Sequence, residues 1–438
     1  MIIMKFGGSS VGDSSRIAKV ARIVKSRYLD SPVVVLSALQ GVTDNLISAA
    51  RSSEEQMSRI AKAEEIIKRH HTVLSELGLS ADLIAEEANQ LRKEMQELDS
   101  GKQLTLQVLD TIMSFGERMS IRIMAGCLSS IGMEAKACDS FDVGLTTDSN
   151  FGYADILPES YDKIRESIAN INGVPVVTGF IGKNREGEIT TMGRGGSDYT
   201  TSIFGAALGA KEIQIWTNTD GVMTADPKVV STAKNIRRLS YAEEFELEAL
   251  GANTLNPRGI RPAMDKNIPV RILNTFNPEH KGTLISNCSR LRSRVASITY
   301  KNDINVLSIS AQKTPVEGEF AERVLGLFAK NGIPVNILSI ENGNLALTID
   351  EKYDVSAIVK ELGKSAKATM KRNMAQVSLV GNKLGMVPGI SETLSESLNR
   401  IRVEMIPHPT SEINRSIMVK EAQMVKAVRL LHNTFFGK

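Results

Sequence analysis

The chain is poor in cysteine and carries almost no excess of charge of either sign. Cys127, Cys138 and Cys288 show no close-spaced pairing, and so sparse and odd a count argues against a disulfide framework and predicts a reducing compartment, the cytoplasm. The 53 basic and 50 acidic residues leave a formal net charge of +3. So balanced a charge gives no reason to expect nucleic acid or a membrane surface as a partner.

Long apolar runs are missing as well. No uninterrupted apolar stretch reaches the length that a membrane span needs. The run Met1–Met4 is too short for the apolar core of a secretory signal, and no basic region precedes it. We therefore expect neither a membrane span nor a signal peptide.

Several common nucleotide and metal motifs are also absent. The chain has no Gly-x-x-x-x-Gly-Lys-Ser/Thr match, which excludes a P-loop, and its N-terminal glycines lack the Gly-x-Gly-x-x-Gly spacing. Zinc motifs and a Gly-x-Ser-x-Gly elbow are missing. His70 and His71 are adjacent in a helical stretch, where neighbours diverge by about 100° and cannot easily share one ion. We predict no metal-binding residue.

The first 290 residues alternate β-type runs with helical segments, which predicts a mostly parallel α/β sheet with helices on both faces. The clearest strands are expected at Ile2–Phe6, Val33–Ser37, Val174–Phe180, Ile213–Thr217 and Val270–Leu273. Residues 44–130 interrupt this rhythm, and Asp44–Glu97 indicates two or three amphipathic helices. These helices either stabilise the fold or form a wall or lid over a site.

The polar segment Ser286–Lys301 predicts a domain boundary, because the pattern changes beyond it. Two successive blocks of β-α-β-β-α type indicate an internal duplication. Strands are expected at Val306–Ser310, Val335–Ile340, Leu345–Ile349, Ala375–Val380, Val403–Ile406 and Ser416–Val419, and helices at Phe320–Lys330, Val355–Leu362, Ile390–Ile401 and Met424–Phe435.

The first strand runs into a glycine-rich turn, Lys5-Phe6-Gly7-Gly8-Ser9-Ser10. Glycines without a Cβ let a ligand approach the backbone N–H groups, and the lysine adds a positive charge. The turn therefore predicts a phosphate cradle. A purely steric turn is the alternative.

A second glycine-rich turn, Gly193–Asp198, precedes a helix. Ser197 or Asp198 can cap that helix, whose N-terminus offers unpaired N–H groups. Arg194 can bind a carboxylate through two hydrogen bonds. The alternative is a tight turn in which Asp198 only caps.

The segment Trp216–Lys228 is a third candidate. It follows a strand and is rich in turn residues, and such loops at the carboxyl ends of strands bind ligands in open α/β sheets. Lys228 could reach a phosphate, although a plain surface loop is the alternative. Glu117 is a lone carboxylate that suits either a capping or surface residue or a ligand for an amine.

Five motifs occur in order and together resemble the aspartokinases of the amino-acid kinase family. They are Lys5-Phe6-Gly7-Gly8-Ser9-Ser10-Val11, Ser114-Phe115-Gly116-Glu117, Gly179-Phe180-Ile181-Gly182, Gly193–Tyr199 and Trp216-Thr217…Asp226-Pro227. The match spans residues 1–285, and the two C-terminal blocks resemble the ACT pair of the same enzymes.

The resemblance implies a three-layer αβα sandwich with a helical insertion, followed by two ferredoxin-like α+β ACT domains. The catalytic domain would occupy 1–290, with the insertion at 44–130. The ACT domains would occupy 303–370 and 371–438, with the option that the C-terminal segment completes the first.

The implied reaction is the ATP-dependent phosphorylation of the β-carboxylate of L-aspartate to 4-phospho-L-aspartate, the first step toward lysine, threonine and methionine. A carboxylate is already a nucleophile at neutral pH, so positioning and charge neutralisation suffice. Mg²⁺ would accompany the nucleotide. The resemblance also implies a homo-oligomer joined through the ACT domains, with lysine or threonine as a candidate effector.

The resemblance also implies roles for individual residues. Lys5 would neutralise the transferred phosphoryl group and Asp198 would hold Lys5. The remaining phosphate and nucleotide ligands would be Gly7, Gly8, Ser9, Thr217, Asn218, Met223, Asp226, Lys228 and Arg258. Aspartate would be bound by Arg194 through its α-carboxylate, by Glu117 through its ammonium, and by Ser37, Thr43, Phe180, Gly195 and Ser197.

The chain departs from the family pattern in a few places. Asn253 stands where a lysine is expected near the ATP phosphates, so Lys228, Arg258 or another cation would have to substitute. Met223 and Asn218 replace an aromatic and an aspartate, and Arg415 replaces a small or apolar residue. Two other interpretations stay open: an amino-acid sensor with a decayed kinase domain, and a kinase of another acidic amino acid.

Overall fold

The computed structural model describes residues 1–52, 58–252, 254–287, 295–311, 317–363, 365–407 and 411–437. Asn253 and Cys288 lie outside these residues. The chain forms two compact units. The first comprises Met1–Val222, Arg237–Tyr241 and Leu255–Cys288, and the second comprises Met223–Ile236, Ala242–Thr254 and Ser289–Lys438.

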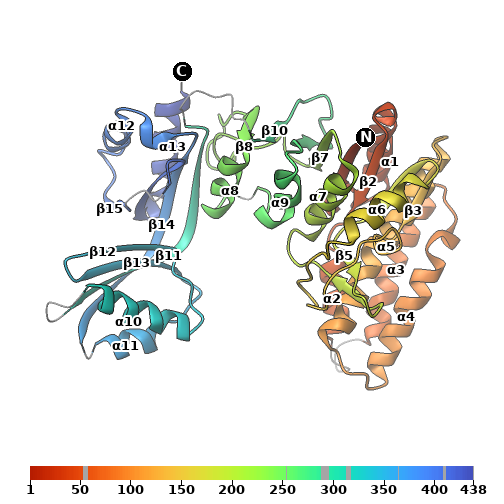
Figure 1. Ribbon diagram of the computed structural model, residues 1–438, viewed down its shortest axis with the longest axis horizontal. Coiled ribbons are helices and arrows are strands. Elements are labelled where there is room, and N and C mark those ends of the chain that lie inside the picture. Colours follow the sequence, from red (N-terminus) through yellow and green to blue (C-terminus); the bar gives the residue numbers. More distant parts are fainter. Residues whose placement is uncertain are drawn as a thin grey trace. The chain divides into compact units, whose positions relative to one another are not determined.

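An eight-stranded sheet forms the centre of the first unit, in the order β3-β4-β2-β1-β7-β9-β10-β8 (Figure 1). The strands are β1 Ile2–Phe6, β2 Pro32–Leu36, β3 Ala135–Cys138, β4 Val174–Thr178, β7 Glu212–Thr217, β8 Arg238–Ser240, β9 Val270–Asn274 and β10 Thr283–Ser286. The sheet is parallel from β3 to β9. Every residue of β2 and β4 is buried, as expected for a parallel sheet covered on both faces. The five predicted strands are confirmed, although β4 ends before Phe180.

Helices cover both faces of this sheet and make the three layers of the unit. One side carries α1 Ser14–Ser26 and α5 Leu106–Ser130, and the other carries α6 Ser160–Ala169, α7 Gly196–Leu208 and α9 Pro257–Asp265. The predicted helical insertion is confirmed as α2 Val42–Ala50, α3 Arg59–Glu76, α4 Ala85–Asp99 and most of α5. Ile67 of α3 and Leu91 of α4 belong to the same hydrophobic core as β1 and β2. The insertion therefore helps to stabilise the sheet.

The second unit contains a six-stranded antiparallel sheet in the order β12-β13-β11-β14-β16-β15. Its strands are β11 Ser297–Ala311, β12 Ile337–Glu341, β13 Asn344–Asp350, β14 Ala366–Val380, β15 Val403–Met405 and β16 Asn414–Lys420. Its helices include α8 Tyr241–Ala249, α10 Glu317–Lys330, α11 Ser356–Leu362, α12 Ile390–Ser397 and α13 Glu421–Phe436. The order of elements confirms the two predicted β-α-β-β-α blocks.

The two blocks share their longest strands. In β11, Ile304–Ala311 pairs with β13 and with the first part of β14, whereas Ser297–Lys301 pairs with Val380–Gln376, the part of β14 that also pairs with β16. Each block therefore obtains its fourth strand from the other. We call these halves the first and the second ACT-like half. The C-terminal helix α13 packs on the core of the second half.

One detail of the predicted boundary is wrong. The sequence indicates a polar linker over Ser286–Lys301, yet Ser297–Lys301 is strand, and its residues Ser297, Ile298 and Thr299 are buried. The register of β11 on β14 shifts between Lys301 and Ile304 and again between Ile304 and Val306. Across the described part of the chain, every helix is too short or too polar to cross a bilayer.

Candidate active site

The site lies where parallel strands of the first unit end together. Phe6 of β1 pairs with Leu36 of β2 and with Trp216 of β7, and Leu36 pairs with Thr178 of β4. Because these four strands are parallel, the segments that follow them reach one edge of the sheet. The first glycine-rich turn and the end of β7 therefore share that edge, and Ser197 of the second turn is bonded to Ser37, the residue after β2.

Lys5 and Asp198 form an ion pair at this edge. The Nζ atom of Lys5 lies 2.7 Å from Oδ1 of Asp198, and the two side chains are 13% and 14% exposed. Lys5 sits near the end of β1 and Asp198 in the first turn of α7. Gly259 of α9 leaves space for Asp198, because a Cβ there would lie 3.0 Å from the Cβ of Asp198. The amine and the carboxylate, remote in sequence, thus meet in a place that solvent can still reach.

The turn after β1 is tied to its surroundings through its backbone. Ser10 N donates to Gly7 O over 2.8 Å, and Ser10 Oγ lies 2.8 Å from Thr275 Oγ1. Gly8 has no room for a side chain, since a Cβ there would lie 2.9 Å from the carbonyl oxygen of Ala38. At Gly7 the nearest atom to such a Cβ would be Lys5 Nζ, at 3.6 Å. The first glycine keeps space in front of the amine, and the second allows close packing.

This difference predicts opposite results for two alanine variants. Gly8→Ala should lower the free energy of unfolding by about 1–3 kcal/mol, because its methyl group meets rigid backbone. Gly7→Ala should leave stability nearly unchanged and still lower the rate of phosphoryl transfer, because its methyl group lies beside the Lys5 amine. Urea unfolding and a kinetic assay of both variants check this. Equal loss of stability in the two would contradict it.

The start of α7 is held against the ends of β2 and β4. Ser37 Oγ donates to Ser197 Oγ over 2.9 Å. A Cβ at Gly179 would lie 2.7 Å from Ser197 Oγ, so only glycine allows this approach. The N–H groups of the first helical turn, which have no partner within the helix, are thereby held at the sheet edge.

Phe180 has a backbone conformation that is unusual for a bulky residue, with φ of 70°. Its N–H donates to Thr200 Oγ1 over 3.0 Å, and its carbonyl accepts from Met192 N over 2.9 Å. This conformation ends β4 before Phe180. Such strain persists where neighbouring contacts fix it, and it is concentrated at functional sites.

Three other residues predicted to bind aspartate are placed as follows. Arg194 is exposed, and no described residue forms a hydrogen bond or ion pair with its side chain. Gly195 has φ of 77° and packs against Asn256, which explains the glycine. Thr43 is half-buried in the first turn of α2. Their roles stay predictions.

The residues predicted to contact nucleotide are divided between the two units. In the first, Thr217 ends β7 and Asn218 is exposed beside it. In the second, Asp226 accepts a hydrogen bond from the hydroxyl of Tyr300 over 2.9 Å and one from Lys228 N over 2.9 Å. Met223 forms an isolated bridge with Asn235.

Arg258 is extensively bonded to protein groups. Its guanidinium donates to Met192 O over 2.6 Å, to Ala154 O over 2.5 Å and to Asp155 Oδ1 over 2.7 Å. It also stacks over the rings of Tyr153 and Tyr199. A nucleotide contact by Arg258 stays a prediction, and these bonds argue against it because few guanidinium donors remain.

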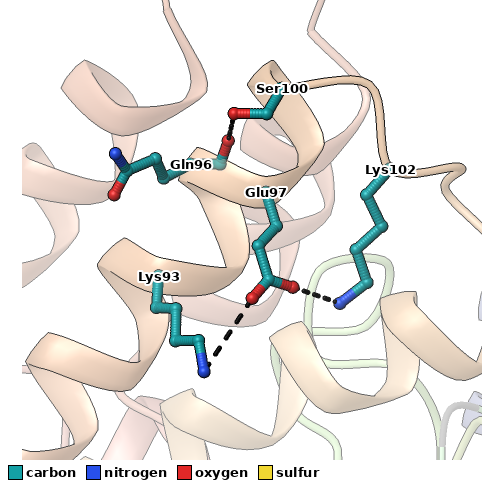
Figure 2. A pocket seen from close by; sticks show the side chains of 5 residues that line it. All are labelled: Lys93, Gln96, Glu97, Ser100 and Lys102. Atoms are coloured by element: carbon teal, nitrogen blue, oxygen red, sulfur yellow. Dashed lines mark hydrogen bonds and ion pairs between the residues drawn. The ribbon is translucent and has the colours of Figure 1, made fainter.

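A cavity of about 580 Å³ lies at the exposed end of α4, away from all the residues described above (Figure 2). It is lined by Lys93, Gln96, Glu97, Ser100 and Lys102. Lys102 Nζ lies 2.8 Å from Glu97 Oε2, and these charged side chains satisfy one another. The cavity belongs to the outer surface of the helical insertion and adds nothing to the site.

Glu117 is the most perturbed carboxylate near the strand ends. It is 3% exposed, and its Oε1 accepts from Ala38 N over 3.1 Å. The other oxygen, Oε2, has no hydrogen-bond partner among the described residues. Burial raises the pKa of Glu117 to about 8, although the backbone hydrogen bonds act to lower it. A buried carboxylate oxygen without a donor suits an ammonium group.

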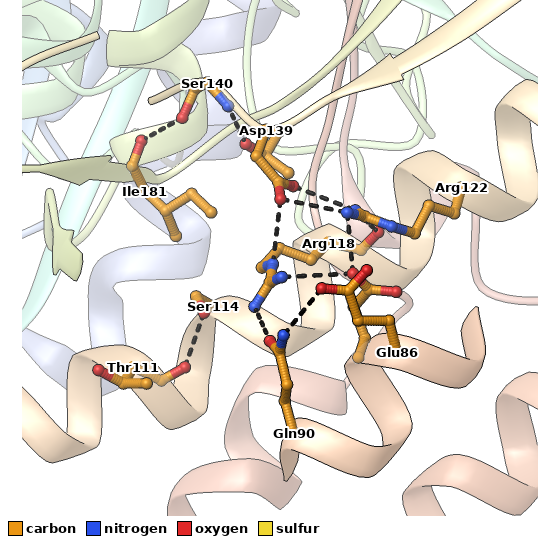
Figure 3. A network of polar contacts seen from close by, with 11 residues as sticks. Glu86, Gln90, Thr111, Ser114, Arg118, Arg122, Asp139, Ser140 and Ile181 are labelled. Carbon is orange, nitrogen blue, oxygen red and sulfur yellow. Dashed lines mark hydrogen bonds and ion pairs between the residues drawn. The ribbon is translucent and has the colours of Figure 1, made fainter. Parts of the chain in front are cut away.

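Directly after Glu117, a buried network of charges fixes α5 (Figure 3). Arg118 Nε lies 3.1 Å from Asp139 Oδ2, and Arg122 Nη2 lies 2.8 Å from Glu87 Oε1. The sidechains of Glu87 and Asp139 are 1% and 3% exposed. The network joins α4 and the residue after β3 to α5, and so sets the rotation of the helix that carries Glu117. Sequence reasoning missed it, although two arginines one helical turn apart after Glu117 were a signal.

Within the described ranges, no group of three or more His, Cys, Asp or Glu side chains is arranged to bind a metal ion. A magnesium ion that accompanies ATP is a different case, because it takes most of its oxygen ligands from phosphates and water. The Lys5 amine and the backbone N–H groups at the site suit phosphate oxygens.

A model of the amino acid kinase family matches residues 1–274, which is most of the chain. The chain belongs to the amino acid kinase family. A model of the ACT domain matches residues 377–435, in the second ACT-like half. Fold and sequence together place an amino acid kinase unit ahead of ACT domains.

The similar proteins include aspartokinases that match nearly the whole of this chain. The chloroplastic aspartokinase 3 of Arabidopsis thaliana is 34% identical over 99% of this chain and 81% of its own. The E. coli aspartokinase III structure with aspartate and ADP (R-state) has a TM-score of 0.82 and 28% identity, with all of both chains covered. The structure of the same enzyme with lysine and aspartate (T-state) has a TM-score of 0.83, 28% identity and coverage of 100% and 99%.

Proposed function

We propose that this amino acid kinase is an aspartokinase that transfers the γ-phosphoryl group of ATP to the β-carboxylate of L-aspartate. The observation that carries the proposal is the ion pair of Lys5 with Asp198, beside glycine turns and the buried Glu117. Aspartate and ADP are bound by the E. coli relative, which supports the same substrates here.

The reaction requires little covalent chemistry from the protein. A β-carboxylate attacks the phosphorus without a strong base, and the ADP oxygen leaves. Lys5 neutralises charge on the equatorial oxygens, the backbone of Gly7–Ser9 donates to them, and Asp198 keeps the amine in place. Mg²⁺, when bound with ATP, neutralises charge on the phosphates.

The protein orients aspartate through its ammonium group and its α-carboxylate, which the reaction leaves unchanged. Glu117 receives the ammonium at its unpaired Oε2, and Arg194 receives the α-carboxylate. Ser37, Thr43, Phe180 and Ser197 shape the rest of the pocket. Discrimination against glutamate follows because an added methylene would move the reacting carboxylate away from Lys5.

Regulation is proposed on separate grounds. Lysine is bound by the T-state of the E. coli relative, and this chain carries two ACT-like halves. We infer that lysine or threonine inhibits the enzyme through these halves, in a homo-oligomer joined there. A cytoplasmic location stays a prediction from the cysteine content.

A coupled assay of ADP release tests the proposed function. With Mg²⁺ and ATP, we expect turnover with L-aspartate and little with L-glutamate or N-acetyl-L-glutamate. Turnover that prefers either of the latter would indicate a kinase of another acidic substrate. Binding of lysine or threonine without any turnover would instead favour the sensor with a decayed kinase domain, the alternative that Asn253 suggests.

A further inference from the structure

The proposed reaction leaves one fully buried carboxylate of α5 without a role. Asp110 is 0% exposed, and it lies about two helical turns before Glu117, close to the same face of the helix. Its Oδ2 accepts from Gly152 N and from Thr191 N, each over 2.8 Å, and its Oδ1 accepts from Thr191 Oγ1 over 2.8 Å. A carboxylate is costly to bury unless such hydrogen bonds compensate for the loss of water. Asp110 therefore fastens two other segments to α5.

One of these segments leads directly to Arg194. Thr191 is the last residue of β6 Ile189–Thr191, which pairs with β5 Ile181–Lys183, and Arg194 follows in the turn after it. Asp110 binds both the backbone N–H and the hydroxyl group of Thr191. The start of the turn that carries Arg194 is thus fixed relative to α5.

Arg258 holds the same turn from α9. Its Nη1 donates to Met192 O over 2.6 Å, and its guanidinium carbon lies 3.9 Å from the centre of the Tyr153 ring. A Cβ at Gly193 would lie 2.6 Å from Cδ2 of that ring, so the turn packs on Tyr153 where only glycine fits. Tyr153 follows Gly152, the other residue that Asp110 holds. The turn is therefore fixed from two sides.

Through these contacts, α5 connects the two groups that are proposed to bind the unreactive end of aspartate. Glu117 is assigned to the ammonium group, and Asp110 fastens the segment that carries Arg194, which is assigned to the α-carboxylate. These two groups of an amino acid are attached to one carbon atom, so their two ligands must keep a constant separation. A single helix that holds both ligands supplies it.

We propose that Asp110 and Arg258 are positioning residues for aspartate, which hold Arg194 at the separation from Glu117 that the α-carboxylate requires. The inference rests on the proposed function and deepens it, because it gives Arg258 a task in the recognition of aspartate in place of a nucleotide contact. Neither side chain has to touch the substrate. Since both act through Arg194, their loss weakens the use of aspartate and leaves the binding of ATP unchanged.

Steady-state kinetics of the full-length enzyme test the proposal. Arg258→Met and Asp110→Ala should each lower kcat/KM for aspartate about tenfold or more, with the KM for ATP within about twofold of the parent value. Asp110→Asn should restore most of the loss, because its amide oxygen can accept from the two N–H groups and its NH2 group can donate to the Thr191 hydroxyl. Arg261→Met is the matched control and should match the parent, since Arg261 lies on the same helix, is 64% exposed and pairs with Asp265.

A double variant tests whether the effect passes through Arg194. In an Arg194→Met background, Arg258→Met should lower kcat/KM for aspartate by less than about a further twofold, because the group that it positions is already absent. Losses that multiply in the double variant would overturn the proposal. A rise in the KM for ATP would also overturn it, because Arg258 would then be a nucleotide ligand.

The same measurements separate failure of this inference from failure of the proposed function. A parent enzyme that phosphorylates aspartate, with a kcat/KM that Arg258→Met leaves unchanged, would overturn the inference alone. A parent that neither binds aspartate in calorimetry nor releases ADP with it would overturn both. If Asp110→Ala does not fold, Arg258→Met decides, because the Arg258 side chain is 19% exposed and its replacement leaves the hydrophobic core intact.

Discussion

Lys5→Met will lower the kcat of aspartate-dependent ADP release by about a hundred- to a thousandfold or more. The magnitude is that expected when one group that neutralises transition-state charge is removed from an active site. Methionine preserves the length and most of the volume of the side chain, so the change removes the charge and little else. Initial rates at saturating ATP and aspartate measure the effect.

The matched control for this variant is Lys211→Met. Lys211 belongs to the same unit, its side chain is 77% exposed, and its ion pair with Asp30 at 3.8 Å is long. Its replacement should leave kcat unchanged. Circular dichroism of both variants verifies that they fold. A Lys5→Met enzyme with more than a tenth of the parent kcat would remove Lys5 from the mechanism.

The partner residue allows a sharper test of how the pair works. If Asp198 acts only by holding Lys5, then Asp198→Asn should cost less than Lys5→Met, and the double variant should be no slower than Lys5→Met alone. Additive losses in the double variant would instead mean that Asp198 has a separate role. Both side chains are about one-seventh exposed or less, so solvent screens the pair only in part.

Much of the site was predictable because its signals are local and its strands are parallel. A short run rich in Val or Ile that stops at Gly, Ser or Asn marks the end of a strand, and the parallel arrangement then places the ends of β1, β2, β4 and β7 side by side. The pair of Lys5 with Asp198 follows from this arrangement, since both sit where a strand or a helix meets that edge. No comparable local signal exists for Phe180, because a left-handed conformation is normally the property of glycine.

The missed features depend on partners that are remote in sequence. The raised pKa of Glu117 results from its burial in α5, next to Ala38 in the segment after β2. A lone carboxylate after a glycine does not indicate such burial. Asp139 and Glu87 approach Arg118 and Arg122 only after α4 and β3 pack on α5. The N-terminal part of β11 reads as a polar linker because its pairing partner, the end of β14, lies far along the chain.

The second large prediction is that the affinity for aspartate depends on pH, because Glu117 must be ionised to bind the ammonium group. With a pKa of about 8, the carboxyl group of the free enzyme is mostly protonated at pH 7. An ammonium group requires the ionised form, so binding of aspartate must release a proton. The dissociation constant should therefore fall roughly tenfold for each pH unit as pH rises toward 8, and level off above it. Calorimetry in buffers of different ionisation enthalpy counts the released proton.

Glu117→Gln should abolish both the proton release and the pH dependence. At pH 8.5 it should also weaken aspartate binding about a hundredfold, because it leaves the ammonium of the ligand without its buried partner. Glu166→Gln is the matched control, since Glu166 is an exposed carboxylate of α6 in the same unit. If the parent enzyme binds aspartate equally well from about pH 6 to pH 9, Glu117 is not the ammonium ligand.

The same group makes a prediction about stability without any ligand. Its pKa rises from 4.5 to about 8 on folding. Between these values the folded protein keeps a proton that the unfolded chain has lost, so the stability contributed by the neutral carboxyl group declines as pH rises and becomes constant above 8. Glu117→Gln stays neutral at every pH and escapes this decline. The free energy of unfolding of the variant minus that of the parent, from urea titrations, should therefore grow as pH rises through this window. A difference in the free energy of unfolding that does not change with pH would show that the carboxyl group is solvated in the folded protein. Its Oε2 would then have water as a partner and would not need the ammonium group of a ligand.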